Sequence, residues 1–228
     1  MKLAHLHDWD VSYQEAQRIQ QALAPRVTLA PLPRNICLVA GVDVAFSKAD
    51  DLFFAAVVVL ALPELNLVEQ RSARTRCRFP YIPGLLSFRE GPVVLSALRK
   101  LRHRPDVVLL DGQGLAHPRR LGLASHIGLW LGLPTVGCAK SRLIGEHEEP
   151  GRRKGDWTPL TDAGELIGSV LRTRHGVKPL YVSPGHLCDH EGARRITLEC
   201  CRRCRMPEPT RRAHLTVGAL KRALLGGR

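Results

Sequence analysis

The sequence predicts an α/β fold in which an antiparallel three-strand meander continues into parallel strand–helix units, giving one mixed sheet flanked by helices. The first observation is a succession of three strand-length apolar runs joined by short connectors. The second is a change of pattern after these runs, to helical segments that alternate with short buried strands. The third is composition: the 228 residues are 44% hydrophobic and 24% charged, which is typical of globular proteins.

The first expected element is a helix over residues 12–24. Ser12 and Glu15 have the spacing of a capping box, in which a serine and a glutamate satisfy each other's backbone amides at a helix start. Pro25 ends this helix because proline cannot continue the hydrogen-bond ladder. A proline-rich connector, residues 31–33, then leads into the sheet.

Three strands are expected over residues 36–46, 52–62 and 67–75. Their connectors are only a few residues long and contain turn-forming side chains. Such connectors are too short for the crossover that parallel neighbours need, so the three strands form an antiparallel meander.

The following segment alternates between helices and strands. Helices are expected over residues 85–103 and 122–131, and buried strands over residues 106–110 and 134–139. Right-handed crossovers place such strands parallel to each other in the same sheet. The order of elements in the core is therefore βββαβαβ.

The remainder of the chain is polar and rich in glycine and proline before structure resumes. Two more strands are expected over residues 165–173 and 179–182, and a helix from His186 or His190 to Cys204. A final helix is expected over residues 217–225. We expect a single domain over residues 1–228, with a core at 36–204 and a basic C-terminal segment at 205–228.

The charge balance favours a polyanionic partner. There are 34 Lys and Arg against 21 Asp and Glu, a formal charge of +13. Nucleic acid is the first candidate for a protein this basic. The positive charge is densest after residue 189, where a solvated helical face is the alternative interpretation.

Other features indicate a protein of the cytoplasm. No apolar run has the length of a membrane span, and no signal peptide is evident. The seven cysteines are odd in number and irregular in spacing, which indicates reduced thiols. We expect no membrane partner, a cytoplasmic location and a monomer.

Three acidic residues occupy positions where carboxylates are unusual. Asp43 interrupts an apolar strand, where an unpaired carboxylate would cost several kcal/mol. Asp111 ends a buried strand, at the edge where α/β sheets place ligand sites. Glu90 lies near the start of the first long helix. Singly, Asp43 could pair with a buried cation and Asp111 could form a turn. Together, the three acids predict a Mg²⁺ site of the kind found in ribonuclease H-like nucleases.

Five segments resemble a known protein family. They are Gly41–Phe46 (GVDVAF), Pro80–Glu90 (PYIPGLLSFRE), Asp111–Arg119 (DGQGLAHPR), Gly137–Lys140 (GCAK) and Ser183–His186 (SPGH). The chain thereby resembles the Endonuclease V family, nucleases that cut nucleic acid near deaminated bases, chiefly hypoxanthine, the base of inosine. The resemblance runs from the N-terminal helix to about His214, and residues 146–165 fit it least well.

The resemblance implies roles for the catalytic candidates. Asp43, Glu90 and Asp111 match the metal-binding acids. Lys140 matches a lysine that steadies the scissile phosphate or the attacking water, although the pattern alone indicates a surface lysine. His117 matches a motif histidine that handles protons or contacts phosphate, although the pattern alone indicates a loop residue.

The resemblance also implies a wedge and a base pocket. Tyr81 inserts into the base stack from a stiff loop formed by Pro80, Tyr81, Ile82 and Pro83, and its alternative is a tyrosine packed under that loop. The pocket for the flipped base is expected at Gly84, Leu85, Gly112 and Gly137. His214 is expected near the site.

The implied activity is that of a deoxyribonuclease V. The expected enzyme uses Mg²⁺, with Mn²⁺ as a substitute, to hydrolyse the second phosphodiester bond 3′ to inosine in DNA. It leaves 3′-hydroxyl and 5′-phosphate ends. Two alternatives remain open: another ribonuclease H-like nuclease acting on structured DNA or on inosine-containing RNA, and a basic nucleic-acid-binding protein without activity. DNA or RNA preference is not readable from these motifs.

A cluster of cysteines and histidines raises the question of zinc. The set is His186, Cys188, His190, Cys200, Cys201 and Cys204. Structural zinc sites pair two short ligand spacings across a loop. Because Cys200–Cys204 are expected on a helix and the histidines belong to another motif, we do not predict a zinc site.

Overall fold

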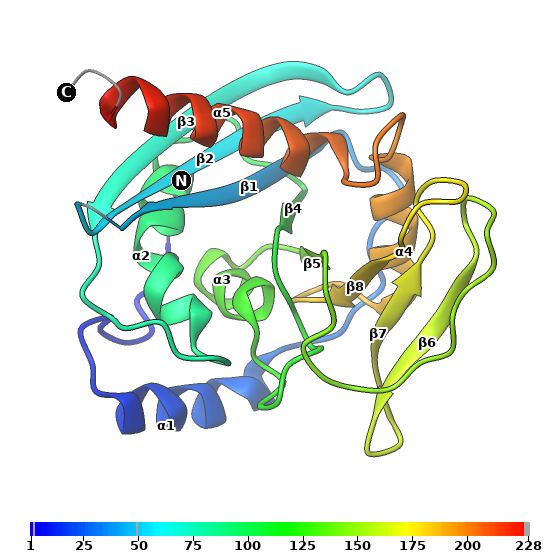
Figure 1. Cartoon of the computed structure of the whole chain (residues 1–228), viewed down its shortest axis with the longest axis horizontal. Helices are drawn as coiled ribbons and strands as arrows, with labels where there is room; N and C mark the ends of the chain where they lie inside the picture. Colours follow the sequence, from blue (N-terminus) through cyan, green and yellow to red (C-terminus); the bar gives the residue numbers. More distant parts are fainter. Residues whose placement is uncertain (2, 49, 226–228) are drawn as a thin grey trace.

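The computed structural model describes residues 1, 3–48 and 50–225, and its central feature is an eight-stranded mixed sheet (Figure 1). The spatial order of the strands is β3-β2-β1-β4-β5-β8-β7-β6. The strands are β1 (Leu38–Ser47), β2 (Leu52–Ala61), β3 (Asn66–Arg76), β4 (Val107–Leu110), β5 (Thr135–Ala139), β6 (Trp157–Asp162), β7 (Glu165–Leu171) and β8 (Leu180–Pro184).

The expected meander is confirmed. Strands β1, β2 and β3 pair antiparallel in chain order, with β1 and β2 in continuous register from Leu38 opposite Ala61 to Ser47 opposite Leu52. The middle strand β2 is buried along almost its whole length, which explains its uninterrupted apolar run. Strand β3 lies at the sheet edge and accordingly carries alternating polar residues.

The parallel part of the sheet is built on β1. Strand β4 runs parallel to β1, with Val42 opposite Leu110, and β5 runs parallel to β4. The residues that follow these two positions are Asp43 and Asp111. The parallel register therefore brings two of the three predicted acids to neighbouring positions at the carboxyl end of β4.

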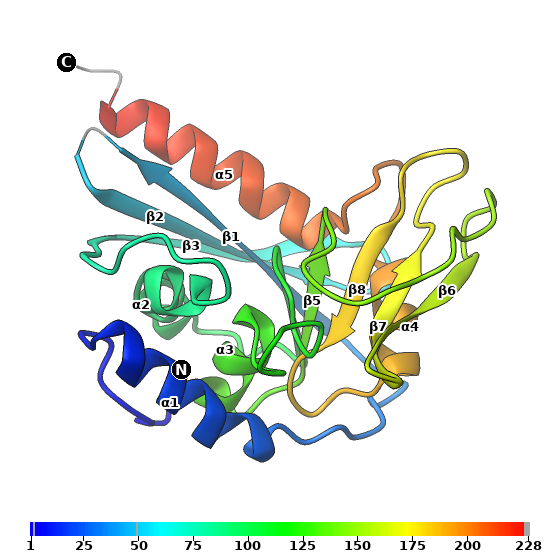
Figure 2. The same ribbon diagram turned by 60° about the horizontal axis from the view of Figure 1, so that its bottom comes forward.

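Helices cover both faces of the sheet (Figure 2). On one face, α2 (Leu86–Arg99) and α3 (Leu123–Leu131) pack their apolar sides against β1, β2 and β4. On the other face lie α4 (His190–Glu199) and α5 (Glu208–Leu225). The helix α1 (Tyr13–Leu23), extended by a 3-10 turn at Ala24–Arg26, lies beyond α2 and α3. None of the described helices combines the length and apolarity needed to cross a bilayer.

The strand β6 has no counterpart in the sequence prediction. It is the outer strand of a hairpin with β7 and only one of its residues is buried, so it lacks the apolar run that marks a buried strand. Pro159 within it also argues against a central strand, and an edge position tolerates it. The turn residues Ala163 and Gly164 both have positive φ, the conformation of a tight hairpin turn.

Two helix boundaries in the C-terminal part also differ from expectation. Helix α5 begins at Glu208 rather than at residue 217. Pro209 disguises this start, because proline is unfavourable within a helix but well tolerated in its first turn. Helix α4 ends at Glu199, so the expectation that Cys200–Cys204 are helical is wrong. These cysteines lie in the connection to α5, where Cys200 and Cys201 are buried.

Candidate active site

The three predicted acids approach one another at the carboxyl end of β4, beside the middle of β1. Asp43 is only 9% exposed although it lies within β1. The backbone amide of Asp111 donates to the carbonyl of Val42 at 3.4 Å, which continues the pairing of the two strands beyond β4. Glu90 lies on α2, which packs over this region of the sheet. Two strands and a helix thus contribute one carboxylate each.

The electrostatics of the acids show that they share one environment. Desolvation raises the pKa of Glu90 to about 8, and the negative charges of Asp43 and Asp111 add to this shift. Desolvation also raises the pKa of Asp43, against the hydrogen bond from His214. Both carboxyl groups therefore carry an electrostatic cost that a cation between them would relieve.

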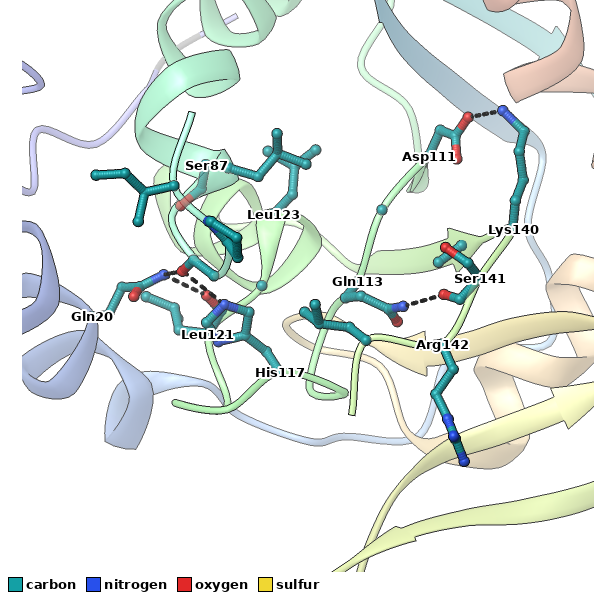
Figure 3. Close-up of a pocket in the computed structure, with 18 of the residues that line it drawn as sticks. Gln20, Ser87, Asp111, Gln113, His117, Leu121, Leu123, Lys140, Ser141 and Arg142 are labelled. Atoms are coloured by element: carbon teal, nitrogen blue, oxygen red, sulfur yellow. Dashed lines mark hydrogen bonds and ion pairs between the residues drawn. The ribbon is translucent and has the colours of Figure 1, made fainter. Parts of the chain in front are cut away.

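Two basic residues, one lysine and one histidine, contact the acids. The Lys140 ammonium, directly after β5, forms an ion pair with Oδ2 of Asp111 (Figure 3). Nδ1 of His214, on α5, lies 2.7 Å from Oδ2 of Asp43. Helix α5 comes this close because β1 carries Gly41 below it: a Cβ there would lie 2.0 Å from the carbonyl carbon of Pro209.

The donor set fits a hard divalent cation. Within the residues that the structure describes, no three His, Cys, Asp or Glu side chains are grouped closely enough to hold a metal ion as they stand. The three carboxylates nevertheless offer only oxygen ligands, the type that Mg²⁺ and Mn²⁺ prefer. Burial, together with the negative charges of Asp43 and Asp111, raises the pKa of Glu90, and a cation bound here would favour its ionised form.

A cavity of about 360 Å³ opens beside the acids (Figure 3). This volume lies in the range of small-ligand pockets. Asp111 and Lys140 line one side of it, so the cavity and the acid cluster are contiguous. The other lining residues are Gln20, Tyr81, Ile82, Pro83, Gly84, Leu86, Ser87, Gly112, Gln113, His117, Leu121, Gly122, Leu123, Ala139, Ser141, Arg142 and Leu143.

Three side chains hold the Gly84 carbonyl in place in the cavity wall. It accepts hydrogen bonds from Nε2 of His117 at 2.9 Å, from Nε2 of Gln20 at 3.0 Å and from the guanidinium of Arg119 at 2.9 Å. Gly84 has a φ of +79°, a conformation that favours glycine. These bonds fix the end of the loop 80–83 against the cavity.

His117 is held as a neutral imidazole. Burial lowers its pKa to about 4, and the neighbouring guanidinium groups of Arg119 and Arg120 also disfavour a positive charge. Its Nε2–H donates to Gly84, and its Nδ1 accepts from the Arg119 amide at 3.1 Å. Both ring nitrogens are thus engaged in the wall; the proton-handling role that the resemblance implies stays a prediction.

Some of the predicted wedge and pocket residues line the cavity and others do not. Tyr81 is 69% exposed at the cavity rim, while Ile82, Pro83, Gly84 and Gly112 line the cavity itself.

Leu85, Gly137 and Pro80 lie elsewhere. The Leu85 side chain is buried with Phe88, and the next residue, Leu86, lines the cavity instead. Gly137 lies behind the wall, where a Cβ would come within 2.5 Å of the Gly114 amide. Pro80 faces a separate hollow beside Arg89.

Several cavity residues escaped sequence reasoning. Gln20 comes from α1 and donates to carbonyls of both Gly84 and Leu121, a connection across the fold that no local pattern encodes. Ser87 lies within the recognised segment Pro80–Glu90, so its motif position is the signal that could have found it. Gln113 places its Oε1 in a buried position without a hydrogen-bond partner among the described residues.

A ribonuclease H-like sheet with carboxylates at one edge, beside a cavity and a lysine, defines a nucleic-acid-cutting hydrolase. The sequence profile of one such group, Endonuclease V, matches residues 21–215. The chain belongs to the Endonuclease V family, and it is therefore a nuclease of a generally metal-dependent kind.

Individual relatives agree with this assignment. Endonuclease V of Dehalococcoides mccartyi is 49% identical over 221 residues, covering 96% of this chain and 99% of its own. The crystal structure of the Streptomyces avermitilis Endonuclease V is 44% identical with a TM-score of 0.90, covering 95% and 96%. The Ciona intestinalis Endonuclease V, 27% identical with a TM-score of 0.80 over 92% and 98%, was solved with a 24mer DNA containing an inosine followed by a ribo-adenosine.

Proposed function

We propose that this protein is a DNA repair endonuclease that recognises inosine and hydrolyses the second phosphodiester bond 3′ to it, using Mg²⁺. The observation that carries the proposal is the contiguity of two parts of the site. Asp111 belongs both to the acid cluster and to the wall of the 360 Å³ cavity. A base held in the cavity would therefore bring a neighbouring phosphate to the acids.

In this proposal Asp43, Glu90 and Asp111 hold one or two divalent cations. When bound, such cations polarise the phosphate and make a water molecule a better nucleophile at neutral pH. Lys140 already pairs with Asp111 on one side of the cavity, where its ammonium can approach a phosphate oxygen. His214 holds one oxygen of Asp43 and so orients the remaining carboxylate oxygen.

The cavity and the wedge account for recognition in this proposal. Tyr81 projects from the rim between two prolines, an arrangement suited to filling the gap left by an extruded base. The cavity is lined largely by apolar side chains and by glycine backbone, which suits a planar base. The relative solved with inosine-containing DNA supports this choice of substrate.

The thiols support the proposed cytoplasmic location. All seven cysteines are free, and burial raises the pKa of Cys138 and Cys188 to about 12. Protonated, buried thiols of this kind are typical of a reducing compartment. We propose that the protein acts there as a monomer.

The decisive experiment uses end-labelled DNA with one inosine beside an identical strand with adenine, each with and without Mg²⁺. We expect one Mg²⁺-dependent nick, one nucleotide beyond the inosine, with Mn²⁺ as an effective substitute. Asp111→Asn should abolish the nick but retain binding. Equal cutting of both strands would remove inosine recognition, and binding without any nick would leave a nucleic-acid-binding protein. An inosine strand with ribonucleotides tests RNA in the same assay.

A further inference from the structure

A basic surface lies at the same end of the sheet as the acids. It is formed by three connecting segments: residues 151–156 before β6, residues 172–178 between β7 and β8, and residues 201–205 between α4 and α5. Strands β5 and β7 run in the same direction, because each pairs antiparallel with β8. The segment after β7 therefore emerges at the end of the sheet where Asp111 follows β4 and Lys140 follows β5 (Figures 1 and 2).

Hydrogen bonds join the three segments to one another. The Gly176 amide donates to the Arg152 carbonyl at 3.0 Å, which connects the segment after β7 to the segment before β6. The Lys154 ammonium donates to the Cys201 carbonyl at 2.7 Å, which connects the segment before β6 to the one before α5. The three segments therefore form one continuous surface.

The charge of this basic surface is almost entirely positive. The segments have the sequences GRRKGD, RTRHGVK and CRRCR, and their one acid is Asp156. This carboxylate already accepts a hydrogen bond at 2.8 Å from the backbone amide of Arg153. Five exposed basic side chains make no hydrogen bond or ion pair with any residue that the structure describes: Arg152, Arg153, Arg174, Lys178 and Arg203. Their N–H donors are available to a partner outside the chain.

Lys140 connects the basic surface to the proposed active site. Its ammonium pairs with Asp111 and lines the cavity, while its backbone carbonyl accepts a hydrogen bond from the Arg205 guanidinium at 2.8 Å. The same guanidinium donates to the carbonyl of Pro179, directly before β8, at 2.6 Å. None of the described residues that line the cavity comes from the three segments. The cavity and the basic surface are therefore separate regions that meet at Lys140.

The direction of the proposed cut determines which part of a substrate reaches this surface. The proposed enzyme holds a base in the cavity and cuts on its 3′ side, so the strand runs from the cavity past the acids in the 5′ to 3′ direction. We propose that the basic surface binds phosphates of the cut strand on the 3′ side of the cut bond; this rests on the proposed function. Guanidinium and ammonium groups bind phosphate oxygens without base preference. The surface thus holds the strand while the cavity selects the base.

The test combines one variant with substrates of different length. The variant carries Arg174→Gln, Lys178→Gln and Arg203→Gln, which remove three positive charges from exposed side chains. The substrates are single-stranded DNA with one inosine and about 16 nucleotides on each side of it, the same strand ending about two nucleotides beyond the cut bond, and the same strand beginning about two nucleotides before the inosine. Wild-type kcat/KM should fall at least about tenfold on the strand shortened at its 3′ end. For the variant the same shortening should change kcat/KM by less than about twofold, because the contacts that the missing nucleotides would make are already lost.

The matched control carries Arg34→Gln, Arg102→Gln and Arg104→Gln. These side chains are also exposed and also make no hydrogen bond or ion pair within the described part of the chain. They lie at the opposite end of the sheet, where β1 and β4 begin. The control loses the same net charge and should keep the wild-type response to shortening at the 3′ end. An equal loss of this response in both variants would show an effect of net charge alone and would overturn the proposal.

The salt dependence separates phosphate contacts from a structural role. On the longest strand, the slope of log kcat/KM against log salt concentration should be smaller in magnitude by about two in the surface variant than in wild type, since each contact to a single strand contributes about 0.7. The loss should appear as a higher KM rather than a lower kcat, as expected when uniform binding is removed. A variant that lowers kcat and keeps the wild-type slope would contradict phosphate binding.

The wild-type protein also tests the proposal without any variant. If shortening at the 3′ end lowers kcat/KM no more than shortening at the 5′ end, the basic surface does not bind the strand beyond the cut and the proposal is overturned. If wild type cuts none of the inosine strands, or cuts an adenine strand equally well, the proposed function itself fails and the inference with it.

Discussion

Glu90 is the residue in which stability and chemistry oppose each other most directly. Its carboxyl lies on α2 close to two other acids, and its pKa of about 8 means that ionisation is costly in the folded protein. The unfolded chain ionises the same group near its ordinary value of 4.5. The folded protein therefore loses stability as the pH rises from 4.5 to about 8.

We predict that Glu90→Gln makes the metal-free protein more stable. At pH 7 the gain in the free energy of unfolding should be about 1–3 kcal/mol, since solvent at the partly exposed carboxylate reduces the full effect. The gain should vanish below pH 4.5, where both folded and unfolded Glu90 are protonated. Urea denaturation of both proteins at pH 4, 6 and 8 measures it.

The same variant links the stability gain to the cation. Mg²⁺ should raise the melting temperature of the wild type, because it binds the folded state preferentially, and should raise that of Glu90→Gln much less. Cutting of the inosine strand should be lost. A variant that is no more stable at pH 8 than at pH 4, relative to wild type, would contradict the shared environment of the acids.

Tyr81 should affect recognition alone. It is 69% exposed, so Tyr81→Ala should leave the free energy of unfolding within about 0.5 kcal/mol of wild type. Loss of base stacking, about 1–3 kcal/mol, should lower kcat/KM on inosine DNA about 5- to 150-fold. A cleavage assay on inosine DNA measures kcat/KM, and thermal unfolding measures the stability. A large loss of stability would instead indicate a tyrosine packed under its own loop.

At the scale of elements, the close contact between α5 and β1 connects the fold to the site. Gly41 permits the contact, and His214 reaches Asp43 because of it. Helix α5 also packs Val217 against Phe54 and Ala56 of β2. A displacement of this one helix would therefore disturb both the core and the hydrogen bond to Asp43, one of the three acids proposed to bind metal.

Two glycine substitutions test this contact, and they should change the free energy of unfolding in opposite directions. Gly41→Ala places a Cβ 2.0 Å from the Pro209 backbone. It should lower the free energy of unfolding by at least about 1–3 kcal/mol and should also lower the rate of cleavage. In Gly218→Ala, on α5 itself, the new Cβ meets only the end of the Arg222 side chain, at 3.5 Å. This variant should raise the free energy of unfolding by about 0.5–1 kcal/mol, because alanine favours a helix more than glycine does. Denaturant titration of both variants decides, and a neutral Gly41→Ala would refute the close contact.

The elements that could be predicted from sequence are those with a strong local signal. Asp43 is conspicuous because it interrupts an apolar strand, and the short connectors around β2 specify the meander. Edge strand β6 carries no apolar run, and Pro209 hides the first turn of α5. Local pattern also cannot separate Leu85 from Leu86, since one helical step decides which leucine faces the core.

At the scale of the whole molecule, the charge of +13 is spread over a protein whose site must hold a negatively charged substrate beside three acids. The basic surface supplies attraction that does not depend on sequence, while the cavity supplies discrimination. These two contributions should separate experimentally, because only the first depends strongly on ionic strength.

We predict that salt weakens binding to inosine and adenine strands by the same factor. With about six phosphate contacts, affinity measured without divalent cation should fall about 10³-fold between 50 and 200 mM salt. The ratio of the two affinities should stay constant, as measured by fluorescence anisotropy. A ratio that changes with salt would show that base discrimination is itself electrostatic.

The long-range hydrogen bond between His214 and Asp43 determines when the site is completed during synthesis and folding. Its partners are 171 positions apart, so they meet only after most of the intervening chain has folded. During synthesis the acids leave the ribosome well before α5 does. A nascent or partly folded chain therefore lacks a completed site, because the hydrogen bond to Asp43 forms only once α5 has been made.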